Sequence, residues 1–144
     1  MKVKQLLDKK GGQVWSVAPG DSVFQALALM AEKNVGALLV VEGNNLVGIF
    51  SERDYARKVI LKGKASKQTR VEEIMSSRVT TVRPDQSIPE CMELMTEQRI
   101  RHLPVLEEGR LVGVISIGDV VKTIISEQEY MIEQLKGYIT GTGQ

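Results

Sequence analysis

The sequence has little of several things that whole classes of protein require. It contains one cysteine and one histidine in 144 residues, which excludes an internal disulfide and a thiolate zinc site. With 19 basic and 18 acidic residues the formal net charge is +1, so no general field attracts nucleic acid or an anionic membrane. No apolar run approaches the roughly 18 residues of a membrane span, and the N-terminal segment lacks a signal-peptide core. These absences predict a soluble, cytoplasmic protein with no nucleic-acid or membrane partner.

What the sequence does contain is an internal repeat. A shift of 65 positions lays residues 17–60 over residues 82–125 without a gap, and about a third of the aligned pairs are identical. Unrelated segments of average composition would match at roughly 6–7% of positions. Two lead-in segments, residues 3–7 and 71–75, align at an offset of 68, because the first copy has three extra residues near 11–13. We therefore expect two half-domains that share a core.

Each copy has the same predicted order of elements. Ser22 and Ser87 begin helices, since Gln or Glu follows three residues later as in a capping box. Two short apolar runs then follow in each copy, joined by a turn-rich tetrapeptide that is typical of a hairpin. These runs are residues 37–41, 46–50, 102–106 and 111–115.

A second helix begins at Ser51 in the first copy and at Ser116 in the second, and short strands at 14–17 and 79–82 lead into the copies. The predicted fold class is α/β (α+β), with two tandem β-α-β-β-α repeats packed about a pseudo-twofold axis. The predicted organisation is a first repeat with its lead-in at 3–63, a linker at 64–70, a second repeat with its lead-in at 71–125, and a C-terminal helix and tail at 126–144.

The C-terminal segment lies outside the repeat. Its apolar residues Tyr130, Met131, Leu135 and Tyr138 are spaced for one face of a helix. This helix is expected either to close the core or to contact a partner, and the final residues 141–144 are expected to fray.

One local pattern is duplicated at the point where a strand ends and a helix begins. Ser51 is followed three residues later by Asp54, and Ser116 by Asp119. A serine and an aspartate at these positions cap a helix, and this structural reading stays open. The same groups also suit a nucleotide, because amides and a hydroxyl donate to phosphate while a carboxylate accepts ribose hydroxyls.

These motifs, together with Arg101-His-Leu-Pro-Val, resemble the tandem cystathionine β-synthase (CBS) domain pair, also called a Bateman module. The Ser51-Glu-Arg-Asp-Tyr segment is similar to that of stand-alone bacterial CBS-pair proteins. The resemblance implies two clefts between the repeats that take AMP, ADP, ATP, NAD(H) or S-adenosylmethionine as regulatory ligands, with no catalytic cofactor. It also implies a homodimer, and a protein partner of unknown identity is possible.

The resemblance assigns ligand-binding residues to each cleft. Ser51 and Asp54 would hold ribose and phosphate in one, Ser116 and Asp119 in the other, and valines would form walls. Those wall residues are Val17 and Val82.

Charge distinguishes the two expected clefts. Arg101 and His102 stand where the first copy has Gly36 and Ala37, and the resemblance implies that they reach the phosphate of the Asp54 cleft. Arg53 adds charge to that cleft. At the equivalent place in the second copy, Gly118 leaves room but no charge. The Asp54 cleft is therefore expected to bind the more highly charged phosphate group.

Two alternatives concern the charged residues near Asp54. Arg57 and Lys58 are three and four residues beyond it, so they either form intrahelical pairs with it or contact phosphate. His102 either contacts a ligand or serves only as the start of a strand.

The expected function is a ligand-sensing module, not an enzyme. No catalytic set and no metal ligand cluster is evident, and Cys91, Met30, Met92 and Met95 fit core positions. Trp15 either lines a cleft or serves packing or a dimer contact. The alternative function is a structural protein–protein interaction module in which the motifs are only caps. Slow nucleotide hydrolysis is a weaker third hypothesis.

Overall fold

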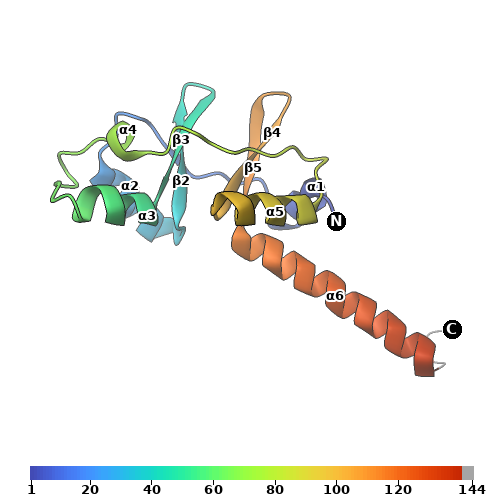
Figure 1. Cartoon of the computed structure of the whole chain (residues 1–144). Helices are drawn as coiled ribbons and strands as arrows, with labels where there is room; N and C mark the ends of the chain where they lie inside the picture. The colour runs from blue at the N-terminus through green and yellow to red at the C-terminus, as the bar shows by residue number, and fades with distance from the viewer. Residues whose placement is uncertain (141–144) are drawn as a thin grey trace.

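The computed structural model describes residues 1–140, and the side chains of residues 1–138. It has the predicted α/β architecture, with two repeats side by side, each with a small sheet and helices (Figure 1). In chain order the elements are α1 Val3–Lys10, β1 Ser16–Val17, α2 Val23–Lys33, β2 Ala37–Glu42, β3 Asn45–Ser51, α3 Glu52–Tyr55, the π-helical segment η1 Ala56–Ile60, α4 Val71–Ile74, α5 Ile88–Gln98, β4 His102–Glu107, β5 Arg110–Ser116 and α6 Ile117–Thr140.

The predicted hairpins form at the predicted places. β2 pairs with β3, and β4 with β5, both antiparallel and in the same register, with an irregularity at equivalent positions. The helices α2 and α5 begin at Ser22 and Ser87, and each serine closes the predicted capping box. These local signals lie within a few residues of one another, so they act without help from distant segments.

The strand that leads into the second repeat is shorter than predicted. In the first repeat β1 runs parallel to β2, and the Leu39 amide donates to the Trp15 carbonyl at 3.2 Å. The residue equivalent to Leu39 is Pro104, which has no N–H to donate. The pairing is therefore reduced to a single parallel bridge between Val82 and Val105.

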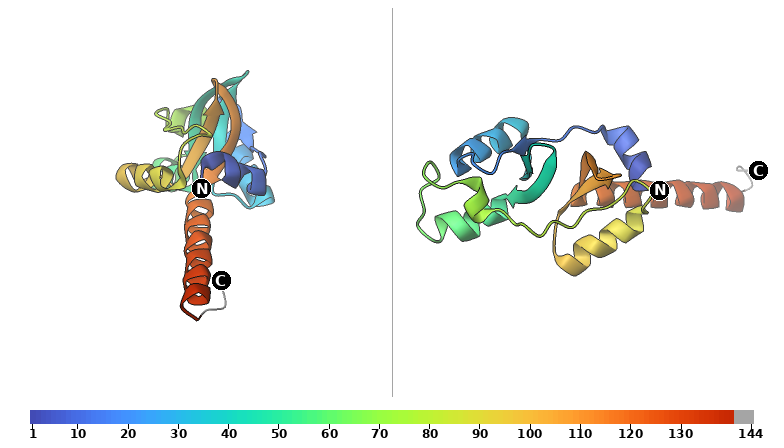
Figure 2. Two further views of the ribbon diagram at one scale, coloured as in Figure 1. Left: turned by 90° about the vertical axis from the view of Figure 1, so that its right-hand side faces the viewer. Right: turned by 90° about the horizontal axis from the view of Figure 1, so that it is seen from above.

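The two lead-in helices exchange places between the repeats. α1 contributes two buried apolar residues to the core of the second repeat, and α4 contributes two to the core of the first. Backbone bonds fix both: the Val3 amide donates to the Gln86 carbonyl at 2.9 Å, and the Val71 amide to the Asp21 carbonyl at 2.8 Å. Each half of the molecule is thus completed by a helix from the other half of the chain, as the views from the side and from above show (Figure 2).

A glycine in the middle of each second hairpin strand makes this packing possible. A Cβ atom on Gly113 would lie 2.8 Å from Leu7 Cδ2, and one on Gly48 would lie 2.6 Å from Met75 Sδ. Leu7 and Met75 are equivalent positions of the two lead-ins. Because these two glycines have no side chain, the lead-in segment from the other half of the chain packs directly against each sheet.

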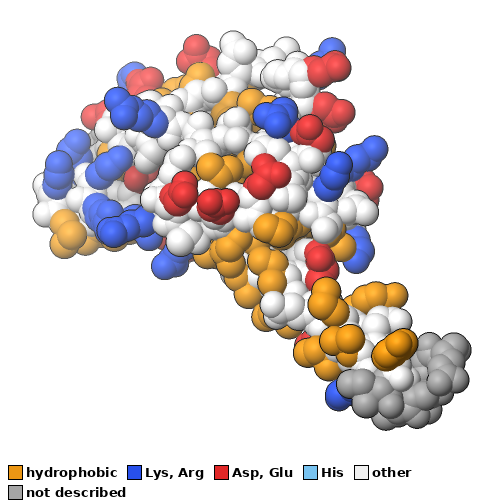
Figure 3. Space-filling view, turned by 45° about the vertical axis from the view of Figure 1, so that its right-hand side comes forward, with side chains coloured by type: hydrophobic (Ala, Val, Ile, Leu, Met, Phe, Trp, Pro, Cys, Tyr) orange, Lys and Arg blue, Asp and Glu red, His pale blue; other side chains and the backbone are white. Residues whose placement is uncertain are grey.

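The last helix is longer than the repeat requires. α6 runs unbroken for 24 residues, so the expected boundary between residues 125 and 126 lies inside one helix. Val120 is buried and Ile124 packs against the core, whereas residues 126–136 are all exposed. The helix extends away from the body, and hydrophobic side chains follow it outward (Figure 3). Its outer part does not close the core.

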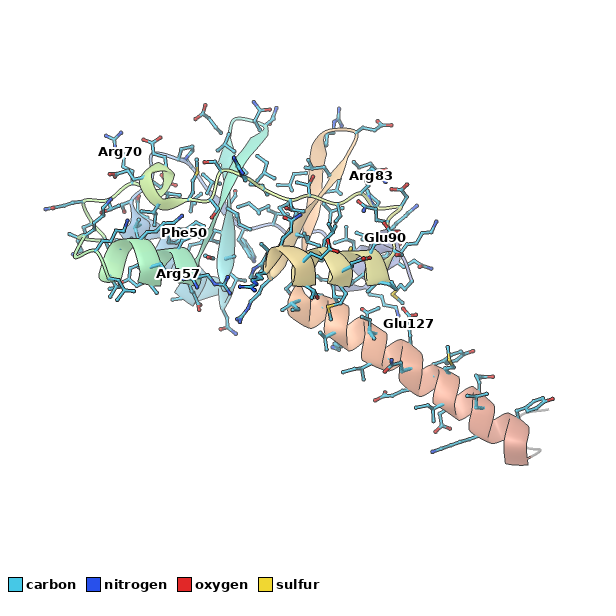
Figure 4. The ribbon with its side chains drawn as sticks, in the orientation of Figure 1. Phe50, Arg57, Arg70, Arg83, Glu90 and Glu127 are labelled. Carbon is cyan, nitrogen blue, oxygen red and sulfur yellow. The ribbon has the colours of Figure 1, made fainter. Side chains whose placement is uncertain are left out.

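Within the described residues, two ion pairs join α6 to the first ten residues of the chain, and one of them is between Asp119 and Lys10. The N-terminal ammonium lies 3.4 Å from Glu127 Oε1, and Figure 4 labels Glu127 on the helix. Among residues 1–140, no helix is long and apolar enough to cross a membrane. The expected fraying of residues 141–144 concerns a segment outside the described residues.

Candidate functional site

A cavity of about 290 Å³, which we call the Asp54 cavity, lies between the repeats. Its lining includes Ser51, Arg53 and Asp54 from the first repeat. Arg101 and His102 come from the second repeat and line the same cavity. The structure therefore brings together the five residues that the sequence assigned to this cleft.

Asp54 is buried at the edge of the cavity, with 8% of its surface exposed. Its Oδ2 accepts hydrogen bonds from the Ser51 amide and hydroxyl, both at 3.1 Å, and the Asp54 amide donates to Ser51 Oγ at 3.2 Å. Its Oδ1 lies 3.3 Å from Lys58 Nζ and accepts a longer bond, 3.4 Å, from Ser76 Oγ. The capping geometry and the intrahelical Lys58 pair are both present. Arg57 is exposed, and no ion pair joins it to Asp54 within the described residues.

Ser76 reaches Asp54 because of the way its segment joins the sheet. Ser76 pairs with Ile49 of β3 through two backbone hydrogen bonds, with N–O distances of 2.9 and 3.0 Å. Ser76 was not predicted as a site residue. The alignment of the lead-ins offered no signal for it, because the equivalent residue is Asp8.

The charge around the Asp54 cavity is net positive, although the carboxylates of Glu52 and Asp54 also line it. Four arginines line it: Arg53, Arg78, Arg99 and Arg101. None of the four has a carboxylate within 4 Å in the part of the chain that the structure describes. Arg78 and Arg99 were missed at the sequence level, since neither belongs to a motif. Unpaired guanidinium groups around one cavity provide donors for an anion with several oxygen atoms.

A second cavity, of about 310 Å³, lies on the Asp119 side and is called the Asp119 cavity here. Lys10, Trp15, His102 and Ser116 are among its lining residues. Of the alternatives for Trp15, cleft lining and packing both hold, since it also packs against the first core. Gly118 lies beside this site, where an added Cβ would meet only Ser116 Oγ, at 3.6 Å.

The carboxylate of Asp119 already has a cationic partner. Lys10 Nζ lies 2.5 Å from Asp119 Oδ2, and the Ser116 amide donates to the same oxygen at 2.8 Å. Burial opposes ionisation of Asp119, but these two contacts outweigh it and lower the pKa of Asp119 below its ordinary value. Asp119 is therefore ionised and bound to Lys10 near neutral pH.

His102 lines both cavities, and its environment disfavours the charged form. Burial is the main cause, and the charges of Lys10 and Arg101 add to it, so the pKa of His102 is lowered despite the opposing charge of Asp119. His102 is therefore neutral at pH 7, where it both donates and accepts one hydrogen bond.

This lowered pKa predicts a pH dependence of stability. The unfolded chain takes up the proton of His102 near pH 6.5 while the folded protein does not, so stability is full above about pH 6.5 and falls as the pH drops toward the folded pKa. Asp119 has a lowered pKa too, but its contribution is lost only at more acidic pH. Urea denaturation between pH 7.5 and 5.0 measures the slope, and we expect His102→Gln to flatten it. An unchanged slope in this variant would contradict the assignment, since the chain has one histidine.

Four predicted site residues line neither cavity: Val17, Val82, Gly118 and Asp119. Val17 and Val82 are 8% and 1% exposed, belong to the cores of the two repeats, and line neither cavity. They are the equivalent residues that pair with β2 and β4, so their side chains are taken up by packing. The expected role as cleft walls does not fit this placement.

Two further sequence-level expectations concern Cys91 and metal ligands. Burial raises the pKa of the Cys91 thiol to about 11, and this cysteine lies in the second core as predicted. No group of three or more His, Cys, Asp or Glu side chains in these residues is placed to hold a metal ion.

Comparison with known proteins agrees with this architecture. The sequence profile of the CBS domain matches residues 3–61 and 71–126. A protein with CBS domains from Burkholderia ambifaria is 54% identical, with a TM-score of 0.86, and the match covers 89% of this chain and 96% of that one. A CBS-domain containing protein from Agrobacterium tumefaciens is 41% identical, with a TM-score of 0.82 and coverage of 85% and 98%. The mitochondrial CBS domain-containing protein CBSX3 of Arabidopsis thaliana is 41% identical over an alignment of 136 residues, which covers 91% of this chain but 66%, just under two thirds, of that protein.

Proposed function

The chain belongs to the CBS domain family as a tandem pair, and from this premise we propose that it is a regulatory module that binds an adenine nucleotide or NAD(H) in the Asp54 cavity. Stand-alone proteins of this kind are typically non-catalytic regulatory modules, and the same role is proposed here. Binding produces a signal only if the ligand has different affinities for two arrangements of the repeats or of two protomers.

The observation that carries this proposal is the composition of the Asp54 cavity. A buried carboxylate faces a space lined by four arginines that have no carboxylate partner among the described residues. A nucleotide has groups that match both: ribose hydroxyls donate to a carboxylate, and phosphate oxygens accept from guanidinium groups. Among the described residues Asp54 Oδ1 accepts one hydrogen bond, from Ser76 at 3.4 Å, and Lys58 Nζ lies 3.3 Å away as an ion pair, so one acceptor position of this oxygen is left for a ribose hydroxyl.

The positive charge also supports an order of preference. More guanidinium groups line this cavity than a single phosphate needs, so we expect ATP and NAD to bind more tightly than AMP. S-adenosylmethionine carries no phosphate and is expected to bind most weakly.

A thermal-shift titration with AMP, ATP, NAD, NADH and S-adenosylmethionine tests the proposal. A ligand present at 100 times its Kd stabilises the folded state by about 2.7 kcal/mol, which raises Tm by several degrees. No shift with any of these compounds at millimolar concentration would reject nucleotide binding. Loss of stability on replacement of Asp54 or Asp119, with no binding, would favour the interaction module whose motifs are only caps.

We also propose that the protein forms a homodimer through the outer half of α6. Positions along this helix at alternating spacings of three and four, the period at which two like helices pack, are apolar at five of six places. The five are Val121, Ile124, Met131, Leu135 and Tyr138, and the sixth is the polar Gln128. Met131, Leu135 and Tyr138 are 62%, 56% and 78% exposed, so the outer face of the helix has no partner within the described chain.

Light scattering after gel filtration measures this association. We expect the native protein to have twice the 15.9 kDa mass of one chain, and the double variant Met131→Glu/Leu135→Glu to have the mass of one chain. Glu129→Gln, on another face of α6, serves as the control and should stay dimeric. A monomeric native protein would reject the proposal.

A further inference from the structure

One lysine joins the end of α1 to the duplicated motif of the second repeat. Lys10 Nζ lies 2.5 Å from Asp119 Oδ2 and donates a further hydrogen bond to the Val114 carbonyl at 2.8 Å. The side chains of Lys10 and Asp119 are 33% and 26% exposed, so the pair is partly shielded from water. Lys10, Val114 and Ser116 all line the Asp119 cavity, whereas Asp119 itself does not. A ligand in this cavity would therefore meet Lys10, whose ammonium group is bound to the carboxylate, and not Asp119 itself.

The repeat provides an internal comparison for this contact. At the lead-in offset of 68, the counterpart of Lys10 is Arg78, which lines the Asp54 cavity. Arg78 forms no ion pair with Asp54; the cation beside Asp54 is Lys58, one turn along the same helical segment. A basic residue thus stands at the same place in both halves but contacts the carboxylate in only one.

The sequence explains why the two halves differ. At the repeat offset of 65, the counterpart of Lys58 is Thr123, which has no charge. Asp119 therefore has no cation four residues along its own helix, and Lys122, three residues along, forms no ion pair with it among the described residues. Lys10 supplies the charge from the exchanged lead-in helix. In the first half Asp54 is already paired with Lys58. Arg78 therefore lines the Asp54 cavity without an ion pair to this carboxylate, and it is available for an anion.

We propose that Lys10 blocks the Asp119 cavity, so that each chain binds one adenine nucleotide and binds it in the Asp54 cavity. This inference rests on the proposed function and assigns its stoichiometry. A ribose that used Asp119 would first have to displace Lys10 from two hydrogen bonds, one of them charge-assisted. Removal of the ammonium should open the second cavity.

Isothermal titration calorimetry with ATP tests this stoichiometry on the full chain. We expect one site per chain in the native protein and two in Lys10→Met, which keeps most of the apolar stem but removes the charge. The new site should bind at least about tenfold more tightly than any residual second event in the native protein. Lys9→Met, the same change at the preceding exposed lysine, is the matched control and should keep one site.

Double variants assign the sites to their cavities. Lys10→Met/Asp54→Ala should keep only the new site, and Lys10→Met/Asp119→Ala only the original one. Thermal melts monitored by circular dichroism check that each variant folds, and Lys10→Gln replaces Lys10→Met if the latter does not.

The outcomes distinguish the role of Lys10 from the nucleotide binding on which it rests. Two sites in the native protein, one site in Lys10→Met, or weaker total binding in that variant would each overturn the role of Lys10 while leaving nucleotide binding intact. No ATP binding by either folded protein would reject the proposed function, and the role of Lys10 with it.

Discussion

Replacement of Asp54 with alanine is expected to weaken ATP binding by about 10- to 100-fold. One hydrogen bond from a ribose hydroxyl to this carboxylate would contribute about 1.5–3 kcal/mol, which corresponds to about 10- to 100-fold in Kd. The same change removes a capping interaction with Ser51, so we also expect a loss of about 1 kcal/mol in the free energy of unfolding. Calorimetry with ATP and urea denaturation measure the two effects separately.

Asp119→Ala is the matched control for this experiment, because it removes the equivalent residue of the other motif. It loses the cap formed with Ser116 and its contact with Lys10, but leaves the Asp54 cavity intact. We expect a similar or larger loss of stability and little change in the affinity of the Asp54 site. Equal loss of ATP affinity in both variants would mean that the binding site does not lie in the Asp54 cavity.

Phe50→Ala is expected to lower the free energy of unfolding by about 3–5 kcal/mol. Phe50 is fully buried in the first core, with residues of η1 and α4 in the same cluster, and Figure 4 labels it within that repeat. Truncation of a buried phenylalanine removes its transfer free energy and leaves a cavity. Since Phe50 directly precedes Ser51, the cavity would form beneath the binding motif. Urea denaturation of native and variant protein measures the difference.

The other phenylalanine of the chain provides the comparison. Phe24 is 49% exposed on α2 and has Lys67 Nζ 5.0 Å from its ring centre. Phe24→Ala should cost less than about 1 kcal/mol. Comparable losses in the two variants would contradict the assigned position of Phe50 in the core.

The parts of the fold that were predicted correctly depend on short-range signals. The capping boxes at Ser22 and Ser87, the hairpin turns and the start of α6 at Ser116 involve residues two to four positions apart. The grouping of Arg101 and His102 with Asp54 followed from the resemblance to the CBS pair, and all three residues line one cavity.

The structural features that were not predicted from the sequence depend on packing between distant segments. The exchange of α1 and α4 cannot be read from the lead-ins, since each has an apolar pattern that fits either core. The same exchange brings Lys10 to Asp119, and no local motif connects these two residues. The resemblance assigned Val17 and Val82 to cleft walls, and strand position alone does not say which face of a short strand is buried. The long, outward course of α6 likewise follows from the lack of a core beyond Ile124.

The exchanged lead-in helices also impose an order on folding during synthesis. α1 leaves the ribosome first, but its backbone partners near Gln86 and Ile88 are about 80 residues away, which takes roughly 4–16 s to translate at ordinary rates. The core of the first repeat is completed by α4, which is the next helix in the sequence. The first repeat can therefore fold before the partners of α1 have been synthesised. The amino terminus, although made first, is therefore among the last segments to find its place, and Lys10 reaches Asp119 only when the second repeat is complete.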